Sequence, residues 1–406
     1  MQIPVALLGC ALILGAGALA VGDYSKYPPE TAPALRLSSI YLADDNAAAG
    51  AARLRLDKIG YSGAQKVFDP ALGRDPANST RWADAAEAFA ATGDAQKAEY
   101  AYQQAAAAAP HDPVTLLAVG YYYLTRKQPA RAAQYFASLL SVSTHEEEAI
   151  MVQNVFGYLE QMRVRDLNLL DTAIPDARNA RLYLKYLMTR TDPAVVRHTW
   201  QWMHTKNYDG DPDTTEYVRY LFAKREYTAA AEDWGAHAAA RNDGYPAKTA
   251  VCNGGFEYAP TGSPFDWEFG AVSGIAAERD AAVHHDGNYS IRVDFTGNDN
   301  PEFYGLRQLT YLAPGRYRLD AWMRTAAITS AEGMRLRLRN YLNNTQIAET
   351  DSMTGTHEWT PVSLTFDVPA GTNLVEVELA RHRALRIDNQ LTGKVWLDTV
   401  TLTRLH

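Results

Sequence analysis

The chain has 406 residues, of which 47% are hydrophobic and 21% charged, a composition typical of a globular protein long enough for more than one core. Its formal net charge of −8 argues against a nucleic-acid partner, because phosphate binding requires a concentrated basic face. Two cysteines, Cys10 and Cys252, provide neither a disulfide framework nor the ligand spacing of a zinc site.

Residues 1–22 contain no charged side chain, and the run approaches the roughly 20 apolar residues of a membrane-spanning helix. The segment is therefore predicted to be either a retained apolar anchor helix or a signal peptide cleaved after Ala18-Leu19-Ala20. A lipoprotein signal is a third alternative, because Leu7-Leu8-Gly9-Cys10 resembles the corresponding cleavage box. All three predict export to the periplasmic or extracellular side, with a membrane tether wherever the segment is retained.

The region 33–244 has helical periodicity and an internal repeat. One unit comprises Trp82, Ala85, Ala86, Phe89, Ala98, Tyr102 and Pro110, with a turn at Gly93-Asp94. The next comprises Leu116, Val119, Gly120, Tyr123, Ala132 and Phe136, and a partial unit of Ala64, Phe68, Ala71 and Pro76 precedes both. The pattern resembles the tetratricopeptide repeat, whose period is about 34 residues. The resemblance implies an α-solenoid, and such solenoids commonly bind protein partners.

The repeat pattern weakens beyond residue 144, but the helical periodicity continues. Amphipathic helices are predicted over 145–162, 177–189, 195–204, 214–225 and 228–240. Alternating aspartates at 209–213 suggest a calcium loop, yet the glycine and glutamate that such a loop needs are missing. Asp211 is instead predicted as the N-cap of the next helix, with Pro212 as its first residue.

After Cys252-Asn253-Gly254-Gly255 the periodicity changes from helical to alternating. Inward-facing apolar sets are predicted within 291–295, 317–323, 334–338, 362–368 and 375–379, separated by turns such as Pro314-Gly315. Several short strands spaced in this way predict an antiparallel β-sandwich over 251–406. The fold class is therefore multidomain, α followed by β.

Short motifs within this β region suggest a family. They are Asn253-Gly254-Gly255-Phe256-Glu257, Trp267, Gly287 with Ser290 and Arg292-Val293, Pro314-Gly315 with Tyr317, Trp359, Val368-Pro369-Ala370-Gly371 and Val395-Trp396-Leu397-Asp398. Together they resemble jelly-roll carbohydrate-binding modules of families 4, 9 and 22, within the galactose-binding-like superfamily. In that family the residues matching Glu257 and Asp398 often hold a structural calcium ion. The alternative is that both carboxylates cap strand ends.

The outward positions of these strands provide the candidate glycan-binding residues. They are Arg318, Asp320, Trp322 and Arg324 on one strand, Arg337 and Tyr341 on another, and Glu376 on a third. If these strands share a sheet, one face combines Trp322 and Tyr341 with paired charges. Such a face suits a glycan, because aromatic rings stack on sugar rings and charged groups hydrogen-bond to sugar hydroxyls. The alternative is a solvated ladder of cross-strand ion pairs.

No motif of a hydrolase nucleophile, zinc protease, phosphate loop or nucleotide-binding fold occurs in the sequence. The favoured interpretation is a non-enzymatic adaptor, tethered to the membrane, that joins a protein-binding helical scaffold to a glycan-binding module. The resemblance suggests a place in polysaccharide assembly or export. A protein–protein scaffold with a purely structural sandwich is the alternative, and a glycan-processing enzyme is a third.

Overall fold

The computed structural model describes residues 72–73, 76–143, 149–162, 167–242, 244–270, 274–297, 300–385 and 390–405. Residues 1–22, which form the predicted anchor or signal peptide, lie outside these ranges, as do Ala64, Phe68 and Ala71 of the partial repeat. Within the described ranges, none of the helices combines the length and the apolar character that a membrane crossing requires.

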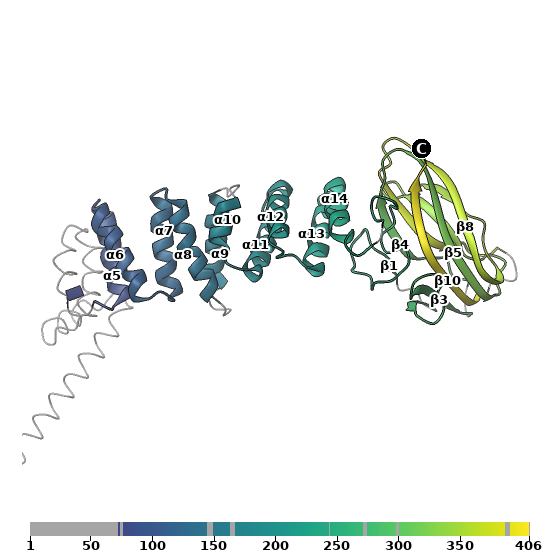
Figure 1. Cartoon of the computed structure of the whole chain (residues 1–406), viewed down its shortest axis with the longest axis horizontal. Coiled ribbons are helices and arrows are strands. Elements are labelled where there is room, and N and C mark those ends of the chain that lie inside the picture. The colour runs from purple at the N-terminus through teal and green to yellow at the C-terminus, as the bar shows by residue number, and fades with distance from the viewer. Residues whose placement is uncertain are drawn as a thin grey trace, which may run out of the picture. The chain divides into compact units, whose positions relative to one another are not determined.

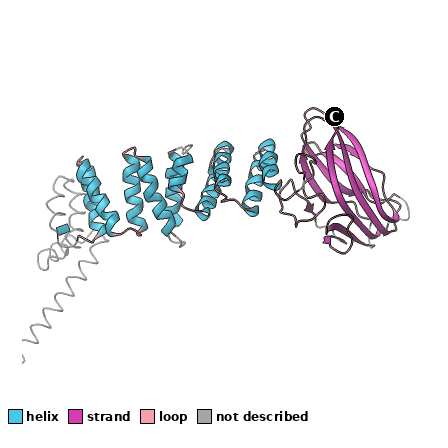
Figure 2. Ribbon diagram, viewed as in Figure 1, coloured by secondary structure: helices cyan, strands magenta, loops and turns pink. Residues whose placement is uncertain are grey.

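The chain divides between Tyr186 and Leu187 into two compact units. The first unit is helical (Figures 1 and 2). Its helices are α5 (Ser79–Ala91), α6 (Ala95–Ala108), α7 (Pro113–Thr125), α8 (Pro129–Val142), α9 (Ala149–Gln161), α10 (Leu167–Ala173) and α11 (Ala177–Arg190), whose last residues belong to the second unit. The predicted domain boundary between residues 244 and 251 falls inside the second unit and stays a prediction.

Helix caps and small residues build the helical pairs as the repeat pattern predicts. The carboxylate of Asp112 accepts the backbone N–H of Thr115 at 2.8 Å, which satisfies one of the donors that the first turn of α7 leaves free. Gly120 of α7 lies against Phe136 of α8, and a Cβ atom at this position would overlap the aromatic ring. The glycine therefore permits the close approach of the two helices, and the predicted repeat register is confirmed.

The second unit begins with the helices α12 (Pro193–Thr205), α13 (Asp211–Ala223) and α14 (Tyr227–Ala238). The prediction for Asp211 was wrong by one position, since Gly210 is the N-cap and Asp211 is the first residue of α13. Its carboxylate turns to α14 instead, where it lies 2.9 Å from His237 Nε2 and accepts a 2.6 Å hydrogen bond from Arg241 Nη1. The hydrogen bonds from Arg241 lower the pKa of Asp211.

Two antiparallel sheets complete the second unit (Figure 2). The strands are β1 (Glu268–Phe269), β2 (Ile275–Asp280), β3 (Ser290–Thr296), β4 (Phe303–Tyr311), β5 (Gly315–Ile328), β6 (Arg335–Asn340), β7 (Gln346–Glu349), β8 (Gly355–Val368), β9 (Leu374–Arg381) and β10 (Thr392–Arg404). Sheet A has the order β1-β4-β9-β6-β7, and sheet B the order β2-β3-β10-β5-β8. The crossovers between the sheets confirm the predicted jelly-roll sandwich.

Alternation along the strands places one apolar core between the sheets. Leu319 and Met323 of β5 enter it from sheet B, while Leu336 of β6 and Val377 of β9 enter it from sheet A. The described chain thus has the order that the sequence resemblances imply, with tetratricopeptide-like helical repeats followed by a carbohydrate-binding-module-like sandwich.

The segment at which the periodicity changes is fixed by buried polar contacts. The side-chain amide of Gln308 accepts the backbone N–H of Cys252 and donates to its carbonyl, both at 2.8 Å. Gly254 lies so close to Val400 that a Cβ atom would overlap the valine carbonyl. Trp267 Nε1 donates to the carbonyl of Asn253 at 3.1 Å. These contacts anchor the start of the sandwich to β4 and β10.

Helices α13 and α14 also contact sheet A within the second unit. Phe222 of α13 meets Tyr341 edge-to-face, with the ring centroids 5.6 Å apart. The hydroxyl groups of Thr228 on α14 and Tyr311 on β4 are hydrogen-bonded at 2.7 Å. The last helices are thus joined to the sandwich by both aromatic and polar contacts.

Candidate functional site

The predicted glycan-binding candidates do not lie on one face. Those on β5 of sheet B are Arg318, Asp320, Trp322 and Arg324, whereas those of sheet A are Arg337 on β6, Glu376 on β9 and Tyr341 just after β6. The condition that all these strands share a sheet is not met, because the chain crosses from sheet B to sheet A between β5 and β6. The outer face of each sheet must therefore be considered separately.

Trp322 is part of an aromatic cluster on the outer face of sheet B. Its indole stacks on the imidazole of His285, with ring centroids 4.0 Å apart and an interplanar angle of 15°. Trp359 of β8 meets the same imidazole edge-on at 5.7 Å. His285 is exposed, and both tryptophans are half-buried. We refer to His285, Trp322 and Trp359 as the aromatic platform.

Polar side chains continue the same face along β5 and β8. Arg318 Nε donates to Asp320 Oδ1 at 2.8 Å and to Ser363 Oγ at 3.1 Å, and the serine hydroxyl donates to Asp320 Oδ1 at 2.8 Å. Arg324 pairs with Glu358 at 3.4 Å. The Arg318 and Asp320 side chains remain 52% and 34% exposed, which leaves hydrogen-bonding capacity for a ligand.

Asp398 positions the loop that contains His285. This buried carboxylate accepts the backbone N–H groups of His285 at 2.8 Å and of Asp286 at 3.1 Å. Burial raises the pKa of Asp398, which the hydrogen bonds partly offset. In the ladder between β10 and β5, Asp398 is the direct partner of Trp322. One carboxylate therefore fixes the loop beside the indole on which its histidine stacks.

The structure does not bring Glu257 and Asp398 together with further acidic ligands. Glu257 Oε1 accepts the backbone N–H groups of Asn288 at 2.8 Å and Tyr289 at 3.1 Å, so that N–H donors occupy the oxygens that calcium would need. Within the described ranges, no group of three or more His, Cys, Asp or Glu residues is placed to hold a metal ion. The observed arrangement does not fit a calcium site, and calcium binding stays a prediction.

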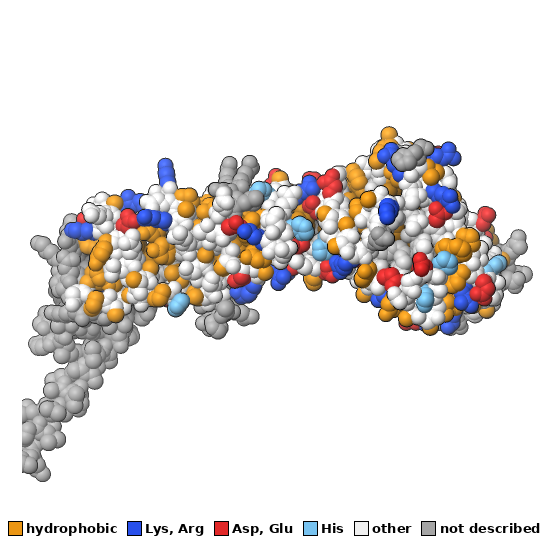
Figure 3. Space-filling model, viewed as in Figure 1, with side chains coloured by type: hydrophobic (Ala, Val, Ile, Leu, Met, Phe, Trp, Pro, Cys, Tyr) orange, Lys and Arg blue, Asp and Glu red, His pale blue; other side chains and the backbone are white. Residues whose placement is uncertain are grey.

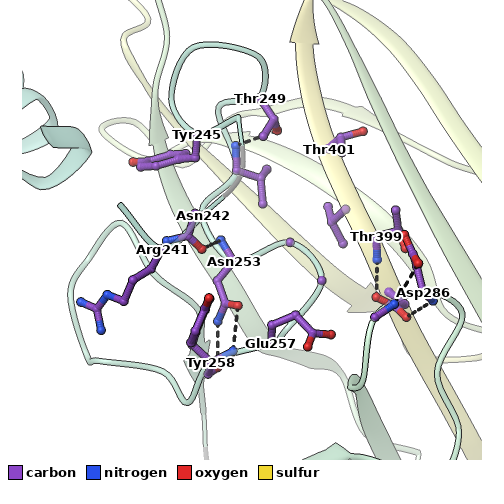
Figure 4. Close-up of a pocket in the computed structure, with 16 residues that line it drawn as sticks. Arg241, Asn242, Tyr245, Thr249, Asn253, Glu257, Tyr258, Asp286, Thr399 and Thr401 are labelled. Atoms are coloured by element: carbon purple, nitrogen blue, oxygen red, sulfur yellow. Dashed lines mark hydrogen bonds between the residues drawn. The ribbon is translucent and has the colours of Figure 1, made fainter. Parts of the chain in front are cut away.

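Both carboxylates border a cavity of about 390 Å³. Figure 4 shows Glu257 and Asp286 at one side of it, with Arg241 and Tyr258 at the other. Arg241 is already bonded to Asp211 at the end of α14, while Glu257 and Asp398 bind backbone N–H groups of the loop that contains His285. These charged groups of the cavity therefore have partners within the protein.

On the outer face of sheet A, Arg337 is part of a closed ion-pair ladder. Its Nε donates to Glu378 Oε2 at 2.7 Å, and its guanidinium lies 4.0 Å from the ring centroid of Tyr304. Arg337 is 7% exposed and Glu378 is 1% exposed, so neither offers a surface to a ligand. This part of the sheet favours the ion-pair alternative. Glu376 and Tyr341 instead line a second cavity, beside α13.

Sequence reasoning did not identify His285 or Ser363 as members of the site. Ser363 lies opposite Asp320 in the pairing of β5 with β8, which only the strand register reveals. His285 lies in a loop, where no periodicity sets the direction of a side chain. The one available signal was the pair His284-His285, which has no metal-ligand spacing.

Charged side chains of both signs are interspersed on the face of the chain that Figure 3 shows. No broad field of one sign is visible on that face among the described residues.

No protein-family model matches the sequence, and neither does any curated protein. Among solved structures, a family 61 carbohydrate-binding module in complex with β-1,4-galactotriose is 19% identical, with 39% of this chain and 100% of that chain covered and a TM-score of 0.29. The xylan-binding domain CBM22-1 from Paenibacillus barcinonensis is 12% identical over 37% and 90% of the two chains, with a TM-score of 0.26. PilW, a type IV pilus biogenesis factor, is 18% identical over 48% and 93%, with a TM-score of 0.28. Likenesses at this level do not assign a ligand.

Proposed function

We propose that this protein is a non-enzymatic adaptor that binds a polysaccharide through its sandwich and a protein partner through its helical repeats. The observation that supports it is the aromatic platform on sheet B, where the imidazole of His285 contacts both Trp322 and Trp359. Sugar rings present apolar C–H faces to aromatic rings, while their hydroxyls bind charged groups beside them.

The polar part of the same face suits an extended glycan. Arg318, Asp320 and Ser363 form one hydrogen-bonded group along the strands from Trp322, and the arginine and aspartate are still partly exposed. Because both rings and hydroxyl-binding groups lie along β5 and β8, a chain of several sugars fits better than a single one. The ligand class is therefore a polysaccharide.

Export and tethering belong to the same proposal. The charge-free run of residues 1–22 supports a membrane anchor or an export signal. The tetratricopeptide-like repeats supply a surface for a protein partner. Together they suit a role in polysaccharide assembly or export outside the cytoplasm.

Glycan-array binding of the purified full-length protein tests the proposal. We expect binding to oligosaccharides of several residues, and weaker binding by a Trp322→Ala variant on the same array. Absence of binding to every glycan, with the protein folded as judged by circular dichroism, would contradict it.

A second candidate function, a scaffold with a structural sandwich, is favoured by a different observation. Contacts such as Phe222–Tyr341 and Thr228–Tyr311 join the last helices to sheet A, which gives the sandwich a structural role. Under this alternative, Trp322→Ala leaves partner binding unchanged and no glycan binds.

A further inference from the structure

The imidazole of His285 covers one face of the Trp322 indole. The two rings are nearly parallel, with an interplanar angle of 15° and centroids 4.0 Å apart. Rings at this separation are in van der Waals contact, so no sugar ring fits between them. His285 is exposed, whereas Trp322 is half-buried. The aromatic face that a ligand meets at this point of the platform is therefore the outward face of the histidine.

The loop that carries His285, residues 281–289 between β2 and β3, is fixed through its backbone. Two carboxylates hold it, Asp398 near its middle and Glu257 near its end. They accept backbone N–H groups at 2.8–3.1 Å, those of His285, Asp286, Asn288 and Tyr289. The protein itself thus places the imidazole on the indole, without the help of a ligand.

The exposed imidazole offers both a ring face and a polar edge. Its Nδ1 lies 3.4 Å from the hydroxyl of Thr399, and among the described residues no hydrogen bond reaches Nε2. When the neutral ring carries its proton on Nδ1, Nε2 is free to accept a hydrogen bond from a sugar hydroxyl. Trp359 meets the same imidazole edge-on at 5.7 Å and adds a second ring beside it.

Protonation changes which side of the imidazole is attractive. The face of a neutral aromatic ring is negative and attracts the C–H groups of a sugar, whereas an imidazolium ring carries positive charge. An imidazolium that lies on an indole instead gains a cation–π interaction, here with Trp322. The proton therefore strengthens the inner contact of His285 and weakens its outward face. Histidine is the side chain that ordinarily changes its charge between about pH 5 and 8.

The charged groups of the surrounding elements are mostly acidic. They are His284 and Asp286 of the loop, Asp398 of β10, Asp320 with its partner Arg318 and Arg324 on either side of Trp322 along β5, and Glu358 next to Trp359 on β8. Burial raises the pKa of Asp398, and the positive charge of His285 opposes this rise, so the carboxylate and the imidazolium stabilise each other. Such surroundings favour protonation of the histidine and disfavour a carboxylated sugar.

We propose that an uncharged glycan stacks on the outward face of His285, and that protonation of this histidine releases it. Trp322 is then a positioning residue, which supports the imidazole from its inner side. The inference rests on the proposed function and adds its regulation: the platform binds glycan under mildly alkaline conditions and lets it go under mildly acidic ones.

The test is calorimetric titration of the full-length protein with cello-, xylo- and manno-oligosaccharides at about pH 8 and about pH 5, with oligogalacturonate as the charged probe. His285→Phe keeps a ring that cannot be protonated, and His285→Ala removes the ring. His284→Phe is the matched control, because His284 is the neighbouring exposed histidine of the same loop. Circular dichroism at both pH values checks that each variant is folded.

We expect the parent to bind at least one uncharged oligosaccharide about tenfold or more tightly at the higher pH than at the lower. His285→Phe should bind equally at both pH values, and His285→Ala weakly at both, while His284→Phe should keep the pH dependence of the parent. If His285→Phe does not fold, the ring resonances of His285 in the parent decide, because the bound oligosaccharide should shift them at the higher pH.

Three results would overturn this inference and leave the proposed function standing. They are equal affinity of the parent at both pH values, tighter binding of oligogalacturonate, and a pH dependence that persists in His285→Phe. The last would assign the effect to Asp398, which the parent and all variants share. Absence of binding to every oligosaccharide at both pH values would overturn the inference and the proposed function together.

Discussion

The imidazole of His285 lies on the indole of Trp322, with ring centroids 4.0 Å apart. The backbone N–H of the same histidine binds Asp398, which pairs with Trp322 across the strands. The residue that the family resemblance assigns to calcium thus holds the loop that completes the aromatic platform. One carboxylate therefore links the anchoring of this loop to the proposed glycan-binding surface.

Replacement of Gly120 by leucine is expected to overpack the contact between α7 and α8. A side chain at this position overlaps the ring of Phe136, and overpacking of this kind costs about 1–3 kcal/mol. Urea unfolding of Gly120→Leu measures the loss, with Gln134→Leu at an exposed position of α8 as the control. Equal midpoints for the two variants would contradict the expected cost of a side chain at this contact.

Gln308→Leu is expected to loosen the junction at Cys252. The amide of Gln308 satisfies both backbone groups of that buried cysteine, and a leucine leaves them unpaired. The expected cost is about 1–3 kcal/mol or more. The melting temperature of this variant is compared with that of Gln346→Leu, which replaces an exposed glutamine on the edge strand β7. A similar shift of the melting temperature in both variants would show that the amide of Gln308 contributes nothing to stability.

Glu376→Gln is expected to change how stability depends on pH. The pKa of Glu376 in the folded protein is about 7, above its ordinary value of 4.5, so the folded state binds this proton more tightly than the unfolded state does. The stabilising contribution of that proton is complete below pH 4.5 and is lost as the pH rises through about 7. Glutamine stays neutral, so the variant should gain stability over the parent as the pH rises from 4.5 to about 7, and should keep this advantage at higher pH.

Melting temperatures across this pH range measure the difference between the parent and Glu376→Gln. Carboxylates whose pKa is lowered, such as Asp280 and Glu349, lose their stabilising contribution as the pH falls. Both proteins contain these groups, so their effect cancels in the difference between parent and variant. Glu358→Gln, at a side chain that is 81% exposed, is the control and should run parallel to the parent. A constant difference between parent and variant at every pH would contradict the pKa assignment.

Export is predicted from residues 1–22. A reporter fused after the chain should be active only outside the cytoplasm, and the full-length protein should sediment with membranes. Release into the soluble fraction with a new terminus near Val21 would identify a cleaved signal peptide. A soluble, full-length cytoplasmic protein would contradict both forms of the prediction.

The sequence predicts the elements of this protein well, because periodicity determines them locally. Spacing placed Gly120 at the helix contact, and alternation placed Trp322 outside the sandwich core. The cap of α13 was misplaced because Asp211 satisfies its hydrogen bonds on α14, a tertiary contact that no local rule contains.

The candidate site was predicted only in part. Arg337 and Trp322 could lie on one face only if their strands shared a sheet, and which strands share a sheet depends on the order of crossovers and not on local alternation. His285 reaches the platform from a loop, and Ser363 reaches Asp320 through strand register. Sequence therefore identified the strand that presents the site, but not the loop and neighbouring strand that complete it.

The most direct test of the proposed function is the affinity of Trp322→Ala for the glycan that the full-length protein binds best. We expect the dissociation constant to rise about tenfold or more, equivalent to roughly 1.4 kcal/mol, with only a modest change in melting temperature because Trp322 is half-buried. Trp82→Ala, at a half-buried tryptophan of the helical repeats, should bind as the parent does. An unchanged dissociation constant for Trp322→Ala would contradict the platform as a glycan-binding surface. Strong destabilisation of this variant, together with a parent protein that binds no glycan, would leave the structural scaffold in its place.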